Sequence, residues 1–510
     1  MEHEFLKQEG QKEQSMKVLL VYPEFPDTYW SFRHALSFEG KKSAFPPLGL
    51  LTVSAMLPES WERRLVDMNV RPLKRADVEW ADVVFASAMI VQQESLKEVI
   101  KFSKKLEKLI VVGGPLVTTA LKPLENVDVA VLGEAEETLP DLIRDLEAGQ
   151  PKPVYSAPER PSMTLTPIPD FKLLNMKPYI AMSVQYSRGC PFNCEFCDII
   201  EIYGRVPRTK SNEQMLLELD ALRKTGWRGT VFIVDDNFIG NLRNVRKLLP
   251  DLTAWQERHG RPFTFITEAS VNLAEHDSVL DLMRQAGFNR VFLGIETPIE
   301  ESLKEAQKGQ NLRHDLLESV KKIQSYGIEV MAGFIVGFDN DPEDIFERMT
   351  HFIRESAIPL AMVGILTALP NTQLWKRLSG ENRLLGESGG SNTHSDLNFH
   401  TTMDPTKLVT GYKSILRSIY DTREYYDRVL ECMKRVSQEV PKSQRGSTII
   451  HDLSVLTRIT LRLGVREPDR MEYWRFVVQT LAHHRAAFAD AMRLAAMGYH
   501  FRKLTEAYCE

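Results

Sequence analysis

Ser187-Arg188-Gly189-Cys190-Pro191-Phe192-Asn193-Cys194-Glu195-Phe196-Cys197 is the stretch that decides the fold and the chemistry of this chain. Its cysteines, Cys190, Cys194 and Cys197, have the spacing C-x3-C-x2-C and follow an apolar run, residues 182–186, that predicts a strand. Three thiolates on one loop can ligate three irons of a [4Fe–4S] cluster and leave the fourth iron without a protein ligand. Such an iron can bind a small molecule and act on it.

Zinc is the main alternative, because it also binds clustered thiolates. Structural zinc normally has four protein ligands, however, and no His or fourth Cys lies near enough in the sequence to complete a set. The other two cysteines, Cys432 and Cys509, are isolated, and we expect them to be small buried residues. The spacing therefore favours a cluster.

The same spacing, with aromatic Phe196 directly before the last cysteine, resembles the signature of the radical S-adenosylmethionine (SAM) superfamily. The resemblance covers roughly residues 178–370. In that family the amine and carboxylate of SAM chelate the open iron, and one electron from the cluster cleaves the sulfonium to a 5′-deoxyadenosyl radical. The resemblance also implies an electron donor such as flavodoxin or ferredoxin.

Length and composition limit the remaining choices. A chain of 510 residues is too long for one core and predicts two to four domains. The net charge of −5 gives no sign of a broad surface for nucleic acid. There is no apolar run long enough for a membrane span and no signal peptide, although peripheral contact with a membrane stays open. Clustered free thiols predict a reducing compartment, the cytoplasm.

Residues 1–150 predict a doubly wound α/β domain, because short apolar runs alternate with amphipathic segments. The expected strands are 18–22, 64–67, 83–88, 109–112 and 127–131, and the expected helices are 48–57, 92–106 and 138–146. Ligands bind such sheets at the carboxyl ends of the strands. The residues there are Ser87, the Gly113-Gly114-Pro115 turn and Gly133-Glu134-Ala135-Glu136.

These turns, together with Phe45-Pro46-Pro47-Leu48-Gly49, resemble the cobalamin-binding domain that precedes many radical SAM cores. The resemblance implies cobalamin contacts at Ser87, Gly113, Gly114, Leu116, Gly133 and Glu134. Domains that supply a histidine to cobalt carry D-x-H-x-x-G, whereas this chain has Asp67-Met68-Asn69, and it has Leu116 where a histidine often follows Gly-Gly-Pro. We therefore expect no protein nitrogen on cobalt. The alternative is a sheet that has lost the cofactor.

Residues 151–177, rich in proline, predict a linker, and residues 178–380 predict a partial (β/α)6 barrel. Its expected strands are 182–186, 230–234, 264–268, 290–294, 330–335 and 361–366, with helices at 212–224, 245–255, 278–285, 312–326 and 344–355. Function in such barrels lies at the carboxyl ends of the strands.

The radical SAM resemblance implies SAM contacts at Phe196, Asp235, Asp236, Glu268, Glu296 and Gly333. Asp235-Asp236-Asn237 replaces the Gly-Gly-Glu that often receives the methionine ammonium, so that a carboxylate is still available there. Glu268 and Glu296 would accept hydrogen bonds from ribose hydroxyls, and the strand with Gly333 would edge the adenine. As an alternative, any one of these carboxylates could merely cap a helix.

Residues 381–510 predict a helical domain with long segments at 406–437, 447–463 and 468–507. Aromatic residues recur along it at helical spacing. We expect them to form a core, and the alternative is a lid over the barrel mouth that shapes an apolar pocket.

The segment after the cluster loop, residues 198–210, resembles a cobalamin-dependent subgroup that includes hopanoid C-2 methylases and bacteriochlorophyll side-chain methylases. The resemblance implies a methyltransferase acting on an unactivated carbon of an apolar polycyclic lipid or tetrapyrrole-like molecule. Alternatives are a cyclase or rearrangement enzyme, a tRNA- or peptide-modifying enzyme, and a non-catalytic cobalamin- or redox-sensing protein. The tRNA alternative would need further cysteines, and residues 1–189 contain none.

Overall fold

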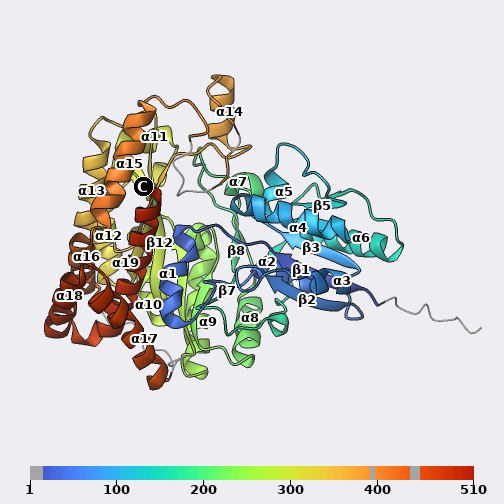
Figure 1. The fold of residues 1–510 in the computed structure, drawn as a ribbon, viewed down its shortest axis with the longest axis horizontal. Coiled ribbons are helices and arrows are strands. Elements are labelled where there is room, and N and C mark those ends of the chain that lie inside the picture. The colour runs from blue at the N-terminus through green and yellow to red at the C-terminus, as the bar shows by residue number, and fades with distance from the viewer. Residues whose placement is uncertain (1–14, 387, 391–396, 437–447, 510) are drawn as a thin grey trace, which may run out of the picture.

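The computed structural model describes residues 15–386, 388–390, 397–436 and 448–509. Figure 1 shows three parts side by side: an N-terminal α/β lobe, a central curved sheet with helices outside it, and a group of C-terminal helices on the far side of the central sheet. The predicted fold class, with two parallel α/β units and a helical C-terminal region, is confirmed.

The first sheet is entirely parallel, and its strand order is β2 (Glu62–Asp67), β1 (Lys17–Tyr22), β3 (Val83–Ser87), β4 (Leu109–Gly113), β5 (Val129–Leu132), β6 (Val154–Ser156). Side chains of β1 alternate between two cores, because Leu19 and Val21 face one and Val18 and Leu20 the other. Helices α3 (Arg75–Trp80) and α4 (Gln93–Lys105) cover one face, and α2 (Leu48–Met56) and α6 (Ala135–Glu147) cover the other. Continuous apolar strands are buried on both faces, as expected of a doubly wound sheet.

Strand β6 lies inside the segment that we expected to be a linker. Residues 154–156 pair in parallel with β5 and add an edge strand to the first sheet. Three residues flanked by prolines are too short to show a period, which is why the sequence did not reveal the strand. The remainder, up to residue 177, holds two short 3-10 turns, Met163–Leu165 and Phe171–Leu173.

The central sheet is also parallel, with the order β14 (Ala361–Ile365), β13 (Glu329–Val336), β12 (Phe288–Glu296), β11 (Phe263–Ala269), β10 (Gly229–Ile233), β7 (Met182–Val184). Helices α8 (Asn212–Lys224), α9 (Leu242–Arg258), α10 (Asp277–Ala286), α12 (Leu316–Ser325) and α13 (Ile345–Ser356) connect its strands. Strands β7 and β14 are edges that do not pair with each other. The sheet is therefore a partial barrel with a lateral opening.

A segment of the N-terminal lobe runs across that opening. Between β1 and α2, the Tyr29 hydroxyl donates to the carbonyl of Val363 in β14, at 3.0 Å. At the other edge, the amide of Ala181 donates to the carbonyl of Ala44 at 3.1 Å, just before β7. Helix α1 (Arg33–Glu39) lies between these points and packs on α19 (Phe488–Cys509), as Figure 1 shows. Residues 29–45 therefore connect both edges of the partial barrel.

The C-terminal helices are α15 (Pro405–Ile419), α16 (Thr422–Arg435), α17 (Ile449–Leu461), α18 (Arg470–His483) and α19. The first predicted segment is divided because the Asp421 carboxylate caps α16 and ends the run before it. Most of the aromatic residues are buried, namely Tyr412, Tyr420, Tyr425, Tyr426, Tyr473 and Phe476. The Tyr420 hydroxyl donates to the carbonyl of Ala361 at the start of β14, the end remote from the strand ends that face ligands in such barrels. These aromatics form a core, and the lid alternative is wrong for them.

Within the described ranges, no helix combines the length and the apolar character needed to cross a membrane.

Candidate active site

The cysteine loop is folded by backbone hydrogen bonds and by one glycine. The amide of Cys190 donates to the carbonyl of Gly204 at 3.1 Å, and that of Cys197 to the carbonyl of Cys194 at 3.2 Å. Gly189 has φ of +93°, and a Cβ atom there would lie 2.8 Å from the Gly204 carbonyl. Only glycine fits this approach. The amide of Glu195 donates to the carbonyl of Ala306 at 2.9 Å, which holds the loop against the barrel.

The thiols have neighbours that suit a cluster. The side-chain amide of Asn237 approaches Sγ of Cys190 at 3.8 Å, and that of Gln310 approaches Sγ of Cys194 at 3.6 Å. Burial raises the pKa of Cys190 and of Cys197, so that their thiolates need nearby positive charge. Ferric and ferrous ions supply that charge. The residues present therefore fit a [4Fe–4S] cluster with three protein ligands.

Within the described ranges, no three side chains of His, Cys, Asp or Glu converge on the position of one metal ion. In a cubane cluster each cysteine ligates a different iron.

Asp235, expected to contact SAM, is occupied by the protein itself. Its carboxylate accepts the amide of Tyr186 at 2.7 Å and the hydroxyl of Ser187 at 2.6 Å, and it is 1% exposed. These bonds fix the start of the cysteine loop. Each of its oxygens already has one donor within the protein, and the SAM contact expected at Asp235 stays a prediction.

Asp236 and Glu268, at the ends of β10 and β11, keep their hydrogen-bonding capacity. Asp236 accepts the amide of Gly189 at 3.3 Å, and within the described ranges Glu268 has no side-chain hydrogen-bond partner. Burial raises the pKa of Asp236 to about 7 and that of Glu268 to about 8, and the other carboxylates of this group add to both effects. A cationic ligand with hydroxyl groups would satisfy them.

Glu296, at the end of β12, forms a buried ion pair with Lys308. The Lys308 ammonium also lies 5.7 Å from the centre of the Phe196 ring. Burial lowers the pKa of Lys308, but Glu296 and the neighbouring Cys194 raise it by more, so that this side chain stays charged beside the cysteine loop. Sequence reasoning missed Lys308, because a lone lysine after a helix gives no signal. Glu296 is less available to ribose than we expected.

The interior of the barrel has an aromatic wall. Trp30, from the segment that closes the opening, stacks on Phe232 of β10 with ring centres 6.1 Å apart and lies 5.2 Å from Phe292 of β12. Phe45 lies 5.0 Å from Phe232. Gly333 of β13 lies beside the Phe292 ring. The N-terminal lobe therefore contributes apolar surface to the inside of the barrel.

In the first sheet, the predicted ligand residues gather at the carboxyl edge. Ser87 ends β3 and pairs in register with Gly113, which ends β4. Gly114 has φ of +96°, and a Cβ atom there would lie 2.6 Å from the Ser87 hydroxyl. A Cβ atom on Gly133, after β5, would meet nothing within 4 Å. The edge thus combines a tightly packed turn with open backbone, which fits a large cofactor lying across it.

Asn69 and Leu116 stand at the positions where a histidine could have ligated cobalt, and both are engaged within the first lobe. The Asn69 amide donates to Asp67 at 2.7 Å, while its oxygen accepts the amide of Phe25 at 2.9 Å. Leu116 is 4% exposed, and its amide donates to the carbonyl of Ala88 at 3.0 Å. Both residues stabilise the turns of the first lobe.

Glu134 joins the two lobes. Its carboxylate accepts Arg188 of the cysteine loop at 2.6 Å and Arg208 at 2.5 Å, and Arg188 also contacts Glu136 at 2.9 Å. All of these acids are buried. The Glu134 carboxylate is thus engaged by two arginines, and the cobalamin contact expected at this residue stays a prediction. At the other side of this junction, the Asn371 amide donates to the carbonyl of Thr119 at 2.9 Å. The carboxyl edges of the two sheets face each other.

Comparisons with known proteins agree with this arrangement. Residues 184–353 match the model of the radical SAM superfamily, and residues 42–143 match that of the B12 binding domain. An uncharacterized methyltransferase of Synechocystis sp. is 45% identical over 96% of this chain and 92% of its own length. The chain belongs to the cobalamin-dependent radical SAM methyltransferases. Its cofactors are a [4Fe–4S] cluster, SAM and cobalamin.

Two further relatives of this radical SAM methyltransferase have named substrates. The hopanoid C-2 methylase of Rhodopseudomonas palustris is 36% identical over 92% of this chain and 90% of its own length. The bacteriochlorophyllide d C-12(1)-methyltransferase of Chlorobaculum tepidum is 25% identical over 74% of this chain and 82% of its own length. Residues 372–510 match a domain of unknown function (DUF4070).

Solved structures confirm the fold of the radical SAM methyltransferase. The cobalamin-dependent radical enzyme OxsB, with aqua-cobalamin and SAM bound, superposes with a TM-score of 0.58 at 17% identity, over 97% of this chain and 80% of that chain. The methyltransferase TsrM from Kitasatospora setae, with cobalamin and a [4Fe–4S] cluster bound, gives 0.58 at 13% identity, over 97% and 100%. At these identities the likeness concerns the fold alone.

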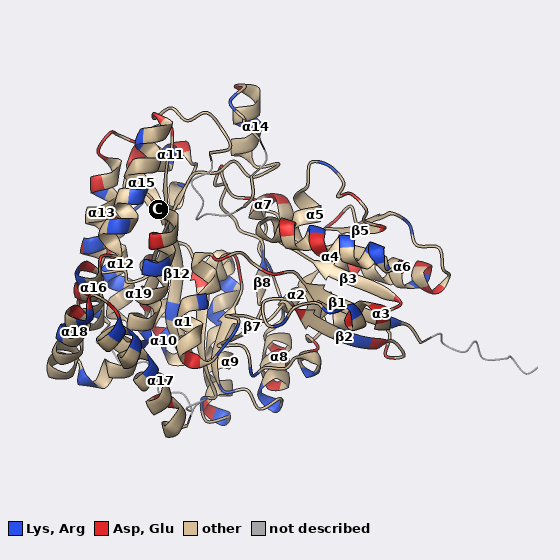
Figure 2. Ribbon diagram, viewed as in Figure 1, with Lys and Arg blue, Asp and Glu red and all other residues tan. Residues whose placement is uncertain are grey.

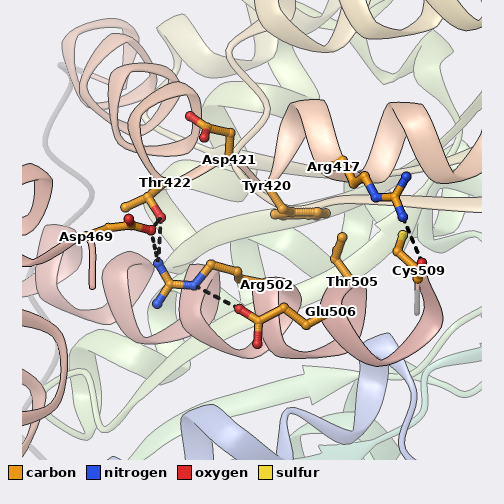
Figure 3. Close-up of a pocket in the computed structure, with 9 residues that line it drawn as sticks. All are labelled: Arg417, Tyr420, Asp421, Thr422, Asp469, Arg502, Thr505, Glu506 and Cys509. Carbon is orange, nitrogen blue, oxygen red and sulfur yellow. Dashed lines mark hydrogen bonds and ion pairs between the residues drawn. The ribbon is translucent and has the colours of Figure 1, made fainter. Parts of the chain in front are cut away.

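A cavity of about 350 Å³ lies among the C-terminal helices of the radical SAM methyltransferase, and none of its lining residues belongs to either sheet (Figure 3). Its cations have partners. Arg417 donates to the carbonyl of Cys509 at 2.7 Å, and Arg502 contacts Asp469 at 3.5 Å and Glu467 at 3.1 Å. This cavity is part of the network that holds the helix ends together.

Proposed function

We propose that this enzyme methylates an unactivated sp3 carbon of an apolar polycyclic molecule, a lipid or a tetrapyrrole. The structural support is the aromatic wall of Trp30, Phe45, Phe232 and Phe292 inside the barrel, since a rigid apolar ring system gains affinity from burial at about 25 cal/mol per Å² without many polar contacts. The similarity to a hopanoid C-2 methylase over nearly the whole chain favours a polycyclic lipid over a tetrapyrrole.

When bound, the cluster and SAM supply an alkyl radical that removes a hydrogen atom, and cobalamin supplies the methyl group. The residues have the tasks of binding and alignment. Cys190, Cys194 and Cys197 would hold the cluster. Asp236 and Glu268 would bind the ammonium and hydroxyl groups of SAM, with Phe196 and Gly333 beside them.

Ser87, Gly113, Gly114 and Gly133 would carry cobalamin on the facing edge of the first sheet. The ion pair of Arg188 with Glu134 would hold this edge in register with the cysteine loop. The substrate carbon would then lie between the two cofactors, where the facing edges exclude water.

An external one-electron donor such as flavodoxin or ferredoxin would reduce the cluster, and free cysteines throughout the described part of the chain support a reducing compartment, the cytoplasm. A small-molecule substrate, and not nucleic acid, fits the net negative charge. Peripheral contact with a membrane would give access to a lipid substrate.

The experiment is a turnover assay with reconstituted holoenzyme, SAM labelled with deuterium in its methyl group, and separate lipid and pigment extracts. SAM is consumed for the radical and again for remethylation of cobalamin. We therefore expect near-equal amounts of 5′-deoxyadenosine and S-adenosylhomocysteine, with a product that carries the label. Deoxyadenosine without S-adenosylhomocysteine would instead indicate cyclisation or rearrangement.

A Trp30→Ala variant tests the aromatic wall. Methylated product should fall at least tenfold while substrate-independent cleavage of SAM is retained, because the cluster loop is intact. Leu217→Gln, at an exposed position on α8, is the matched control. Equal product from Trp30→Ala and the control would refute the role of the wall.

A further inference from the structure

Large apolar side chains are exposed with unusual density on α17 and α18. Within the described part of the chain, seventeen such side chains are exposed, and nine of them lie between residues 449 and 481. Single exposed apolar residues are ordinary, but a concentration of them indicates an interaction surface. Figure 2 shows stretches of uncharged ribbon on these two helices.

On α17 the exposed row consists of Ile450, Leu453 and Leu461, with exposed fractions of 81%, 58% and 50%. Val465, 56% exposed, continues the row in the π-helical turn Arg462–Arg466. The opposite face of α17 is buried through Val455 and Ile459. A helix on the surface of a soluble domain normally has a polar outer face, whereas this one exposes the three large apolar side chains of this row beside the polar Asp452, Thr457 and Arg458.

On α18 a second row consists of Met471, Trp474, Val478 and Leu481, with exposed fractions of 73%, 42%, 64% and 46%. The Trp474 indole nitrogen donates to the carbonyl of Gly464 at 2.9 Å, which joins this row to the end of the first. Tryptophan with its polar edge satisfied and its ring exposed is typical of a boundary between water and lipid.

Beside these rows lies a pocket of about 330 Å³ that is rich in arginine. Arg458, Arg462 and Arg466 line it together with His34 and Tyr499, and no acidic residue does. Arg458 donates to the carbonyl of Phe38 at 2.9 Å, and Arg462 contacts Glu467 at 3.0 Å, a residue outside the lining.

Arg466 is exposed and has no side-chain partner within the described ranges. The cavity of Figure 3 differs, because its lining includes Asp469 and Glu506, which are ion-pair partners of Arg502. Guanidinium groups bind phosphate with paired hydrogen bonds.

We propose that the α17–α18 face, defined by these two rows and the arginine pocket, docks on an anionic phospholipid bilayer, with a lipid phosphate in the pocket. Apolar side chains would enter the boundary of the acyl chains, and the arginines would meet the negative surface. A second copy docked pocket to pocket would bring like charges together, because no acidic residue lines the pocket. The inference deepens the proposed function, because an insoluble polycyclic lipid is found in bilayers, but its test needs no turnover.

The test is sedimentation of the full-length holoenzyme with vesicles of phosphatidylcholine alone or mixed with phosphatidylglycerol. We expect binding to the anionic vesicles that weakens with salt, and little binding to the neutral ones. Arg466→Glu should weaken partitioning by about tenfold, and Leu453→Gln combined with Leu461→Gln should weaken it at least as much. Both changes are at exposed positions, so the fold should be retained.

Matched controls are Lys101→Glu on α4, exposed and without an ion pair within the described ranges, and Leu217→Gln on α8. Each should bind vesicles as the unchanged protein does. No vesicle binding, or equal losses in the control variants, would overturn the proposal. So would a dimer that only the α17 variants dissociate, or binding of inorganic phosphate at Arg466 without vesicle association. Failure here leaves the labelled-methyl assay unaffected, and the converse also holds.

Discussion

Arg188 Nη1 lies 2.6 Å from Glu134 Oε2, so that the residue two positions before Cys190 is bonded to the turn after β5 in the other lobe. Arg188 is 9% exposed and Glu134 is 8% exposed. Glu136 and Arg208 complete the buried group. The position of the cluster loop is therefore set relative to the first sheet by charge as well as by packing.

Glu134→Gln should loosen this junction. Removing one partner of a buried ion pair leaves the other charge uncompensated, and we expect a loss of about 3–5 kcal/mol in the free energy of unfolding. In turnover, the rate of methylation should fall more than the rate of SAM cleavage, because the cluster is retained while the cofactors lose their alignment. Glu137→Gln, exposed in the first turn of helix α6, which directly follows Glu134, is the control. The ratio of deoxyadenosine to methylated product is measured beside a chemical denaturation curve. A raised ratio would indicate lost alignment, whereas an unchanged ratio with lower stability would indicate destabilisation alone.

The cluster cysteines give the sharpest prediction. Cys190→Ala, Cys194→Ala or Cys197→Ala should abolish both the EPR signal of the reduced cluster and the formation of deoxyadenosine. Cys432→Ala should keep both, because that cysteine is buried among the C-terminal helices. A Cys194→Ala protein that cleaves SAM at the native rate would refute the assignment.

Cobalamin should bind with its own base displaced and without a nitrogen ligand from the protein. The Asn69 side chain is hydrogen-bonded to Asp67 and Phe25, and the hydrocarbon side chain of Leu116 has no atom that could ligate cobalt. The EPR spectrum of the Co(II) form should show no nitrogen superhyperfine splitting, and Asn69→Ala should leave the spectrum unchanged. Splitting that Asn69→Ala removes would contradict this prediction.

The raised pKa of Glu268 leads us to expect that the stability of the protein depends on pH. Its pKa is raised to about 8 in the folded protein by burial, then by Asp236 and Asp235, whereas an unfolded Glu titrates near 4.3. Between about pH 4.3 and pH 8, the folded state holds more protons, so the free energy of unfolding contributed by this group falls as pH rises.

The ligand-free protein should therefore melt at a lower temperature at pH 8 than at pH 6, and Glu268→Gln should reduce the difference. The same variant should bind SAM about 10- to 100-fold more weakly, as expected on losing a hydrogen bond to a charged group. Glu213→Gln, exposed on α8, provides the reference for both measurements. An unchanged pH dependence in Glu268→Gln would assign the titration to other carboxylates.

The sequence predicted both sheets because their strands are short apolar runs, buried on both faces, that alternate with amphipathic helices. It also predicted the three cysteines on one loop and the glycine turns at the edge of the first sheet. The spacing of nearby residues decides such features. Contacts between distant segments gave no signal. Neither the bond of Asp235 to Ser187 nor the pairing of Glu134 with Arg188 follows from any local pattern.

The segment 29–45 was missed for a similar reason. Read alone, Trp30 and Phe32 look like ordinary core residues of the first lobe, since nothing in the local pattern indicates that their rings pack elsewhere. The ring centre of Phe32 instead lies 5.7 Å from that of His500 in α19, and Trp30 lies inside the barrel. Only the topology of the folded chain reveals that the opening between β7 and β14 needs cover.

The crossing of this segment has a consequence for the modularity of the enzyme. A shortened chain that starts at β7 would leave the backbone of both edge strands without cover and the Phe232 ring without Trp30, and such edges invite association between chains. The barrel is therefore not a module that can be separated from the N-terminal lobe. Any chimera that exchanges the cobalamin lobe for that of a relative must therefore keep, or replace, the side chains of Trp30 and Phe45 that pack inside the barrel.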